Sequence, residues 1–168
     1  MLDTIFGLPV HPLIVHATVV IVPAAAIAVL LSVLWPRFRA WAGWGPLALA
    51  VAASVLAPLS TSSGESLEHR IGDSDLIEAH SELGDLLIWW AIPLVLLAAA
   101  GYWLNTFRGG RRKRRTKTVS IILTVLAVIV SIGILVQVAL IGHSGAQSAW
   151  SDVASASSTT TTSPGDDD

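Results

Sequence analysis

Apolar residues in this chain gather into four long runs separated by short polar segments. The runs cover about residues 13–35, 44–62, 86–104 and 119–141. A helix needs about 20 mostly apolar residues to cross the hydrocarbon core of a bilayer. Because backbone groups in lipid must be paired internally, each run is expected to be helical. We therefore predict an all-α fold, a four-transmembrane-helix bundle formed by residues 1–150.

Prolines help to place the ends and bends of these helices. Pro12 is expected in the first turn of the first helix, where a backbone N–H would have no partner, and Pro36 should follow its end. Pro23 and Pro93 lie inside apolar runs and should bend their helices, which neighbouring helices in a membrane can accommodate. The second run is rich in alanine, and small side chains let helices approach closely in lipid.

The segment between the second and third runs, residues 63–85, is polar and acidic. From Asp75 onward it shows a helical pattern that continues into the third run. One stripe on that helix contains four residues at helical spacing: Leu76, His80, Leu83 and Leu87. The sequence therefore predicts a short acidic helical loop in which His80 faces the bundle.

Composition supports a membrane protein and excludes several kinds of site. Apolar residues make up 53% of the 168 residues and charged residues 13%, about half the share in ordinary soluble domains. The absence of cysteine excludes disulfides, iron–sulfur clusters, c-type haem and a thiol nucleophile. Residues 151–168 are rich in Ser and Thr and end in three aspartates, so this tail is predicted to be disordered.

The distribution of charge predicts the orientation in the membrane. Nine of the ten basic residues follow the first or third run: Arg37, Arg39, Arg108, Arg111, Arg112, Lys113, Arg114, Arg115 and Lys117. Basic residues near span ends mark the cytoplasmic side. We therefore expect an N-out/C-out protein whose acidic loop and five histidines are extracytoplasmic. Beside two spans, the basic run at 108–117 is expected to contact anionic lipid, not nucleic acid.

Three histidines form the candidate site. His16 lies about 6 Å inside the outer rim of the first helix, and an ionisable residue within a span is costly enough to indicate function. At the same end, His80 and His143 belong to the third and fourth helices. Imidazoles in a helix bundle can bind haem iron, Cu or Zn. Six residues are candidate metal ligands: His16, His80, His143, Glu65, Glu82 and Asp85.

Two kinds of cofactor remain open. Paired histidines could hold haem b, but its propionates favour basic partners and this end offers only Arg70. A divalent ion such as Cu or Zn would be favoured by the acidic surroundings. In the alternative without a cofactor, the histidines only form hydrogen bonds between helices. The candidate partners of His16 are Ser60, Thr61, Ser62 and Ser144. The sequence contains no nucleophile–base pair that would indicate an enzyme.

His11 is assigned a different role from His16. The two residues are five apart, which places them about 140° apart around a helix, so both cannot face one centre. We predict that His16 faces inward and that His11 flanks the helix start. In the fourth span, Ser131 and Gln137 are expected to pair between helices. Whether His11 and His69 join the site stays open.

The sequence around these histidines resembles a bacterial four-span membrane family, domain of unknown function family 2231. The stretch from Leu8 to His16 is similar to its His-Pro-x-x-Val-His signature, with further likeness at residues 80–84 and 142–145. Ala17-Thr18 stand where members usually have Phe-Pro. Some relatives are fused to cytochrome c or Rieske modules. The resemblance implies a multi-pass protein of the bacterial plasma membrane, with respiratory or redox-chain proteins as partners.

Together, these features indicate an integral membrane protein that binds haem or a transition metal through histidines at its extracytoplasmic end. The lipid bilayer is its expected environment, and no nucleic acid is expected among its partners. The alternative is a structural or assembly protein of the membrane that binds no cofactor.

Overall fold

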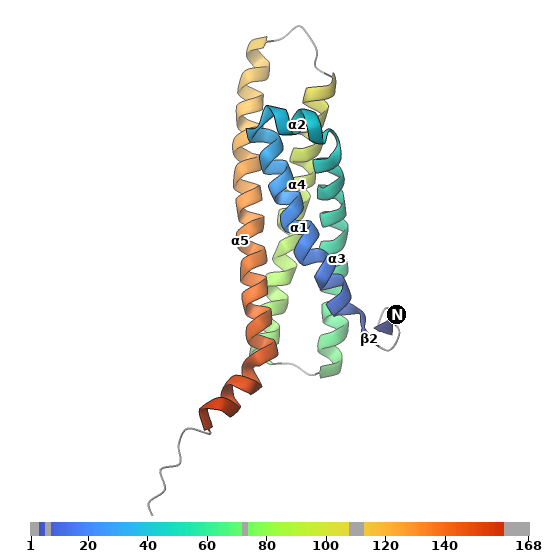
Figure 1. The fold of residues 1–168 in the computed structure, drawn as a ribbon, viewed down its shortest axis with the longest axis vertical. Coiled ribbons are helices and arrows are strands. Elements are labelled where there is room, and N and C mark those ends of the chain that lie inside the picture. The colour runs from blue at the N-terminus through green and yellow to red at the C-terminus, as the bar shows by residue number, and fades with distance from the viewer. Residues whose placement is uncertain (1–3, 6–7, 72–73, 108–112, 160–168) are drawn as a thin grey trace, which may run out of the picture.

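The computed structural model describes residues 4–5, 8–71, 74–107 and 113–159. Their backbone forms five helices: α1 (Val10–Leu34), α2 (Pro36–Ala42), α3 (Gly45–Ile71), α4 (Asp75–Phe107) and α5 (Lys113–Thr159). Two short antiparallel strands, β1 (Thr4–Ile5) and β2 (Leu8–Pro9), precede α1. Figure 1 shows α1, α3, α4 and α5 side by side as a bundle, with α2 crossing near one end.

Four of these helices are long and apolar enough to cross a membrane, which confirms the predicted four-span bundle. Successive long helices run in opposite directions, so α1 and α4 share one direction and α3 and α5 the other (Figure 1). The most extensive contacts join α1 to α3 and α4 to α5. Further contacts of α3 with α4 and of α1 with α5 close the bundle.

The helices extend beyond the predicted apolar runs at the histidine-bearing end. Helix α3 continues through the acidic segment to Ile71, and α4 begins at Asp75, as the sequence pattern predicts. Helix α1 begins at Val10, three residues before the predicted start. Pro12 still lies in the first turn, where the first four N–H groups have no partner within the helix. His11 is therefore part of the helix and does not merely flank it.

At the C-terminus, α5 continues to Thr159. The tail predicted to be disordered, residues 151–168, thus overlaps the last turns of this helix, and residues 160–168 lie outside the described part of the chain. The boundary between bundle and tail stays a prediction.

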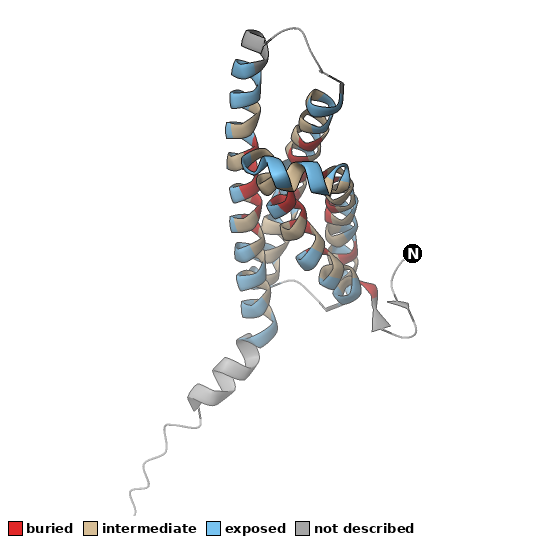
Figure 2. Cartoon of the chain, turned by 45° about the horizontal axis from the view of Figure 1, so that its top comes forward, coloured by how far each residue is buried: buried red, intermediate tan, exposed pale blue. Residues whose placement is uncertain are grey.

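Each long helix contributes one stripe of small and aliphatic residues to the core (Figure 2). The spacing within each stripe is three or four residues, as expected for one face of a helix. Alanines dominate, and the three buried alanines of α3 have no exposed surface, consistent with close packing of small residues in lipid. The principal core residues are Val22, Ala25, Val29, Ala50, Ala53, Ala57, Leu87, Ala91, Leu94, Ala98, Ala127, Val130 and Ile134.

Large apolar side chains cover the outside of the bundle. Val20 and Leu96, for example, are each 64% exposed near the middle of their helices. Contiguous apolar surface of this kind is unfavourable in water and is expected where lipid is the solvent. Trp41, in α2, and Trp44, two residues after its end, are 83% and 68% exposed. Indole rings favour the boundary between hydrocarbon and headgroups, so α2 marks that boundary at one end.

A glycine on α5 lets α4 approach closely. A Cβ atom added at Gly133 would lie 2.4 Å from Cζ3 of Trp90, far closer than carbon atoms can approach. We expect Gly133→Ala to displace the indole and lower the free energy of unfolding by about 1–3 kcal/mol. On the same helix, nothing lies within 4 Å of a Cβ added at Gly142. Gly142→Ala is the matched control and should leave the unfolding midpoint in detergent unchanged or slightly raised. Equal midpoints for the two variants would contradict the packing described here.

Candidate functional site

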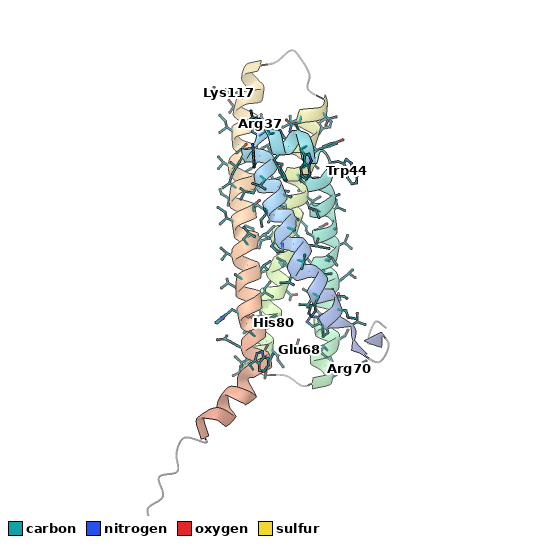
Figure 3. The ribbon with its side chains drawn as sticks, viewed as in Figure 1. Arg37, Trp44, Glu68, Arg70, His80 and Lys117 are labelled. Atoms are coloured by element: carbon teal, nitrogen blue, oxygen red, sulfur yellow. The ribbon has the colours of Figure 1, made fainter. Side chains whose placement is uncertain are left out.

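The two ends of the bundle differ in their polar side chains. Figure 3 shows Arg37, Trp44 and Lys117 at the end where α2 lies, and Glu68, Arg70 and His80 at the opposite end. The opposite end contains the first turns of α1 and α4 and the last part of α3. We call it the histidine end, because His11 and His80 lie there on α1 and α4.

His11 connects α1 to α3. Its Nδ1 lies 3.0 Å from Oγ of Ser63, which is buried. The imidazole ring also covers Gly64, where an added Cβ would lie 3.1 Å from Cε1 of His11. The ring further interacts with the backbone carbonyl of Ser60. A serine–glycine step on α3 therefore both accepts the hydrogen bond and makes room for the ring.

His80 connects α4 to α5 in the same way. Its Nδ1 lies 3.0 Å from Oγ of Ser144, and an added Cβ at Gly145 would lie 2.9 Å from its Cε1. The backbone carbonyl of Ile141 is a second partner of this ring. The prediction that His80 faces inward therefore agrees with its half-buried position. We call the two arrangements the histidine clamps: His11 on Ser63–Gly64 and His80 on Ser144–Gly145.

The tautomer of both clamped histidines follows from the direction of the serine hydroxyl protons. A serine hydroxyl has one proton. Ser63 donates its proton to the Ser60 carbonyl at 2.9 Å, and Ser144 donates to the Ile141 carbonyl at 3.0 Å. With the serine protons on these carbonyls, each hydroxyl accepts from the imidazole and Nδ1 carries the ring proton. In the neutral ring, Nε2 keeps its lone pair for another partner.

The two clamps belong to a pattern that occurs twice in the chain. In α1, buried residues follow His11 at intervals of 7, 11, 14 and 18 residues, and in α4 they follow His80 at the same intervals. Both histidines therefore extend the core stripe of their helix. The eight residues are Thr18, Val22, Ala25 and Val29 in α1 and Leu87, Ala91, Leu94 and Ala98 in α4. His11 and His80 also lie close enough to interact electrostatically.

The other histidines of the predicted site have different surroundings. His16 is exposed, and its Nδ1 bonds to the Pro12 carbonyl of its own helix. His143 is also exposed, on α5, and so is His69 on α3. The structure therefore reverses the predicted roles in α1: His11 faces the bundle and His16 faces outward. The physical reason is the 140° between them, because the side of α1 that continues the core stripe contains His11.

The predicted carboxylate ligands do not complete a metal site in this conformation. Glu65, Glu82 and Asp85 are all exposed. In the described part of the chain, no three His, Asp or Glu side chains are grouped so that they could hold a metal ion. A site of three or more protein ligands drawn from the predicted set therefore stays a prediction. The clamps place two imidazoles at the same end of the bundle, one of which, His11, lies outside that set.

Of the two polar residues expected to pair within the fourth span, one does so. Nε2 of Gln137 donates to the Leu83 carbonyl at 2.7 Å and so joins α5 to α4 just below the His80 clamp. Ser131 is completely buried, and its Oγ has no hydrogen-bond partner among the described residues. The bond from Gln137 fixes the rotation of α5 relative to α4, which keeps Ser144 opposite His80.

Comparison with known proteins identifies the family. A family model described as a predicted membrane protein, DUF2231, matches residues 7–157, which is most of the chain. The chain belongs to the DUF2231 family. The match confirms the resemblance inferred from the sequence and includes both histidine clamps. With four apolar helices, this DUF2231 protein is a multi-pass protein of a lipid bilayer. Neither the curated proteins nor the solved structures include a match to it.

Several residues of the clamps in this DUF2231 protein were missed by sequence reasoning. The sequence pattern predicts His11 as a residue that flanks the helix start, and it indicates no role for Ser63, Gly64 or Gly145. A signal for them exists in the sequence: a serine–glycine step lies just beyond the end of the second apolar run and of the fourth. The equal spacing from each clamped histidine to its core stripe is a second signal.

The clamp around His80 can be measured with a double-mutant cycle. His80→Ala and Ser144→Ala should show a coupling energy of about 0.6–1.5 kcal/mol in the free energy of unfolding, because each removes one partner of a hydrogen bond between helices. His16→Ala combined with Ser63→Ala is the matched control, since His16 bonds only within α1. The effects of these two substitutions on the free energy of unfolding should add to within about 0.5 kcal/mol. A coupling energy near zero for His80 and Ser144 would show that the clamp contributes nothing to stability.

Proposed function

We propose that this DUF2231 protein binds a transition-metal ion at the histidine end, with Nε2 of His11 and Nε2 of His80 as its protein ligands. The observation that carries this proposal is that the two imidazole rings have equivalent hydrogen-bonding surroundings. Each ring has its Nδ1 hydrogen-bonded to a serine of a neighbouring helix. In the tautomer with the proton on Nδ1, Nε2 carries the lone pair that a metal ion needs. The two rings also lie within electrostatic reach of each other.

Histidines that bind metals commonly have this environment. A ligating imidazole usually donates its other N–H to a carbonyl, carboxylate or water, which fixes the tautomer and orients the ring. Here the serine hydroxyl and the carbonyl one helical turn earlier take that role for both rings. The glycine beneath each ring allows the imidazole to approach the backbone of the neighbouring helix closely. Both proposed ligands, His11 and His80, are therefore oriented by helices alone.

The charge and ligand type indicate which ion would fit. Neutral imidazole suits copper, zinc and iron. Glu68, Glu65 and Glu82 lie on the same end segments of α3 and α4, and their negative charge favours a cation over an anionic porphyrin. Water or another molecule would fill the remaining coordination positions, as in metal sites that keep open positions. A redox-chain partner, suggested by the fused modules of relatives, would be relevant if the ion is copper or iron.

A second function without a cofactor is favoured by the same hydrogen bonds. Both histidines bond to serines of other helices, as a purely structural role requires. In that case the clamps would serve only to hold the helix pairs together in lipid. The two proposals differ in one measurable property, because only the first requires Nε2.

The experiment compares clamped with exposed histidines. The full chain is purified in mild detergent, incubated with Cu, Zn or Fe, desalted, and assayed for bound metal by mass spectrometry and for a Soret band. We expect about one ion per chain in the wild type, lost in His11→Ala and in His80→Ala. His16→Ala and His143→Ala are matched controls, since both residues are exposed, and should retain the ion. Ser144→Ala should weaken binding about 10–100-fold, as expected for a partner of a ligand.

Three outcomes would contradict the metal proposal. A wild-type protein without stoichiometric metal would favour the structural role. Equal loss of metal in all four histidine variants would indicate binding to surface histidines. A Soret band that depends on His11 and His80 would replace the bare ion with haem iron.

We also propose that the histidine end is extracytoplasmic, so that both termini are outside. The distribution of basic residues supports this orientation. Because the chain has no cysteine, single cysteines report on sidedness without background. In intact bacterial cells, an impermeant maleimide should label His69→Cys and should label Arg37→Cys only after the membrane is opened. Both positions are exposed in the structure, so accessibility differs only by side. The reverse labelling pattern would overturn the orientation.

A further inference from the structure

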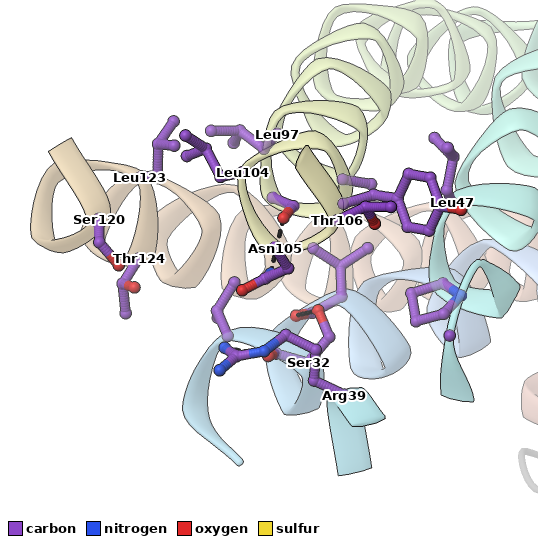
Figure 4. A pocket seen from close by; sticks show the side chains of 17 residues that line it. Ser32, Arg39, Leu47, Leu97, Leu104, Asn105, Thr106, Ser120, Leu123 and Thr124 are labelled. Atoms are coloured by element: carbon purple, nitrogen blue, oxygen red, sulfur yellow. Dashed lines mark hydrogen bonds between the residues drawn. The ribbon is translucent and has the colours of Figure 1, made fainter. Parts of the chain in front are cut away.

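The end of the bundle opposite the histidines contains a cavity that the proposed metal site does not use. It has a volume of about 390 Å³, whereas about 10–15 Å³ suffices to hold one water. It lies where the end of α1, the beginning of α3 and the end of α4 meet α2 and the beginning of α5 (Figure 4). Trp41 and Trp44, which are strongly exposed, place this region at the level of lipid headgroups.

The lining of the cavity combines one cation with neutral polar groups. Arg39, from α2, is the charged residue, and no carboxylate lines the cavity among the described residues. Hydroxyl and amide groups come from other helices, including Asn105 of α4 and Ser120 and Thr124 of α5 (Figure 4). Such a lining carries net positive charge and offers hydrogen-bond donors. It is therefore suited to an anion.

Arg39 is positioned for this purpose and still has donors available. One of its Nη1–H groups donates to the Ser32 carbonyl at 3.2 Å, near the end of α1. A guanidinium has five N–H donors arranged in a planar fork that matches the oxygens of a phosphate. The bond to Ser32 directs the side chain back over the cavity, since Ser32 itself lines it. Arg37, two residues earlier on α2, is exposed and does not line the cavity.

We propose that this cavity binds a phosphate group, and that its source is the headgroup of an anionic phospholipid. The apolar part of the lining supports a lipid as the source. Leucines from three helices, Leu47, Leu97 and Leu123, lie beside the polar groups and provide contact for the first carbons of an acyl chain. The location at the headgroup level gives a lipid direct access, and no passage through the bundle is required. This site is separate from the proposed metal site, which lies at the other end of the same helices.

The experiment measures lipid affinity in matched arginine variants. The full chain in detergent is titrated with phosphatidylglycerol, phosphatidylcholine or inorganic phosphate, and binding is followed by native mass spectrometry and by the unfolding midpoint. We expect wild type to favour phosphatidylglycerol over phosphatidylcholine. Arg39→Gln should weaken binding of phosphatidylglycerol about tenfold or more, because charge-assisted hydrogen bonds are lost. Arg37→Gln removes the same charge from the same helix and should change that affinity less than about twofold.

Each outcome bears on the proposal. Arg39→Lys keeps the charge without the planar fork, and an affinity between those of wild type and Arg39→Gln would support phosphate recognition. Because each variant is compared with itself in phosphatidylcholine, a general loss of stability does not imitate the result. Equal weakening by Arg37→Gln and Arg39→Gln would overturn the site in favour of surface charge alone. Inorganic phosphate binding as tightly as phosphatidylglycerol would support the phosphate site but overturn a lipid as its source.

Discussion

The contact between an imidazole and a serine–glycine step sets how the helices meet at the histidine end. Lipid tails are as apolar as leucine side chains, so the hydrophobic effect does little to hold one spanning helix against another. Close packing of small residues and hydrogen bonds between helices must do so. Alanine stripes provide the close packing along the middle of the bundle. The clamps of His11 and His80 provide hydrogen bonds between helices where these stripes reach the end of the bundle.

The same packing of helices forms both the core and the candidate site. Each clamped histidine lies on the continuation of its own core stripe, so the packing that buries Val22 or Ala91 also directs the imidazole inward. Helices α1 and α4 run in the same direction, as do α3 and α5 (Figure 1). The two helix pairs therefore present equivalent groups at the same end. Parallel structural repeats of this kind are a known way for membrane proteins to build one site between two halves.

The sequence predicted the parts of the fold that depend on one helix at a time. Four apolar runs predicted four spans, and the helical pattern from Asp75 correctly predicted both the start of α4 and the inward direction of His80. The orientation of α1 was predicted wrongly because Pro12 suits any position in a first turn, so it did not fix where the helix begins. The core stripe would have decided the question: Val22 lies eleven residues, about three turns, after His11, but six residues after His16.

What the sequence could not predict depends on two helices at once. Ser63 and Ser144 face histidines that are 52 and 64 residues away, and only the packed pair shows which serine meets which ring. The same holds for the cavity near Arg39, which is formed by residues from all five helices. Charge was informative without packing, because nine of the ten basic residues follow the first or third apolar run, away from the acidic segment. That separation also bears on the chemistry: the carboxylate-rich end, which carries both clamped imidazoles, attracts cations, and the end with Arg39 attracts anions.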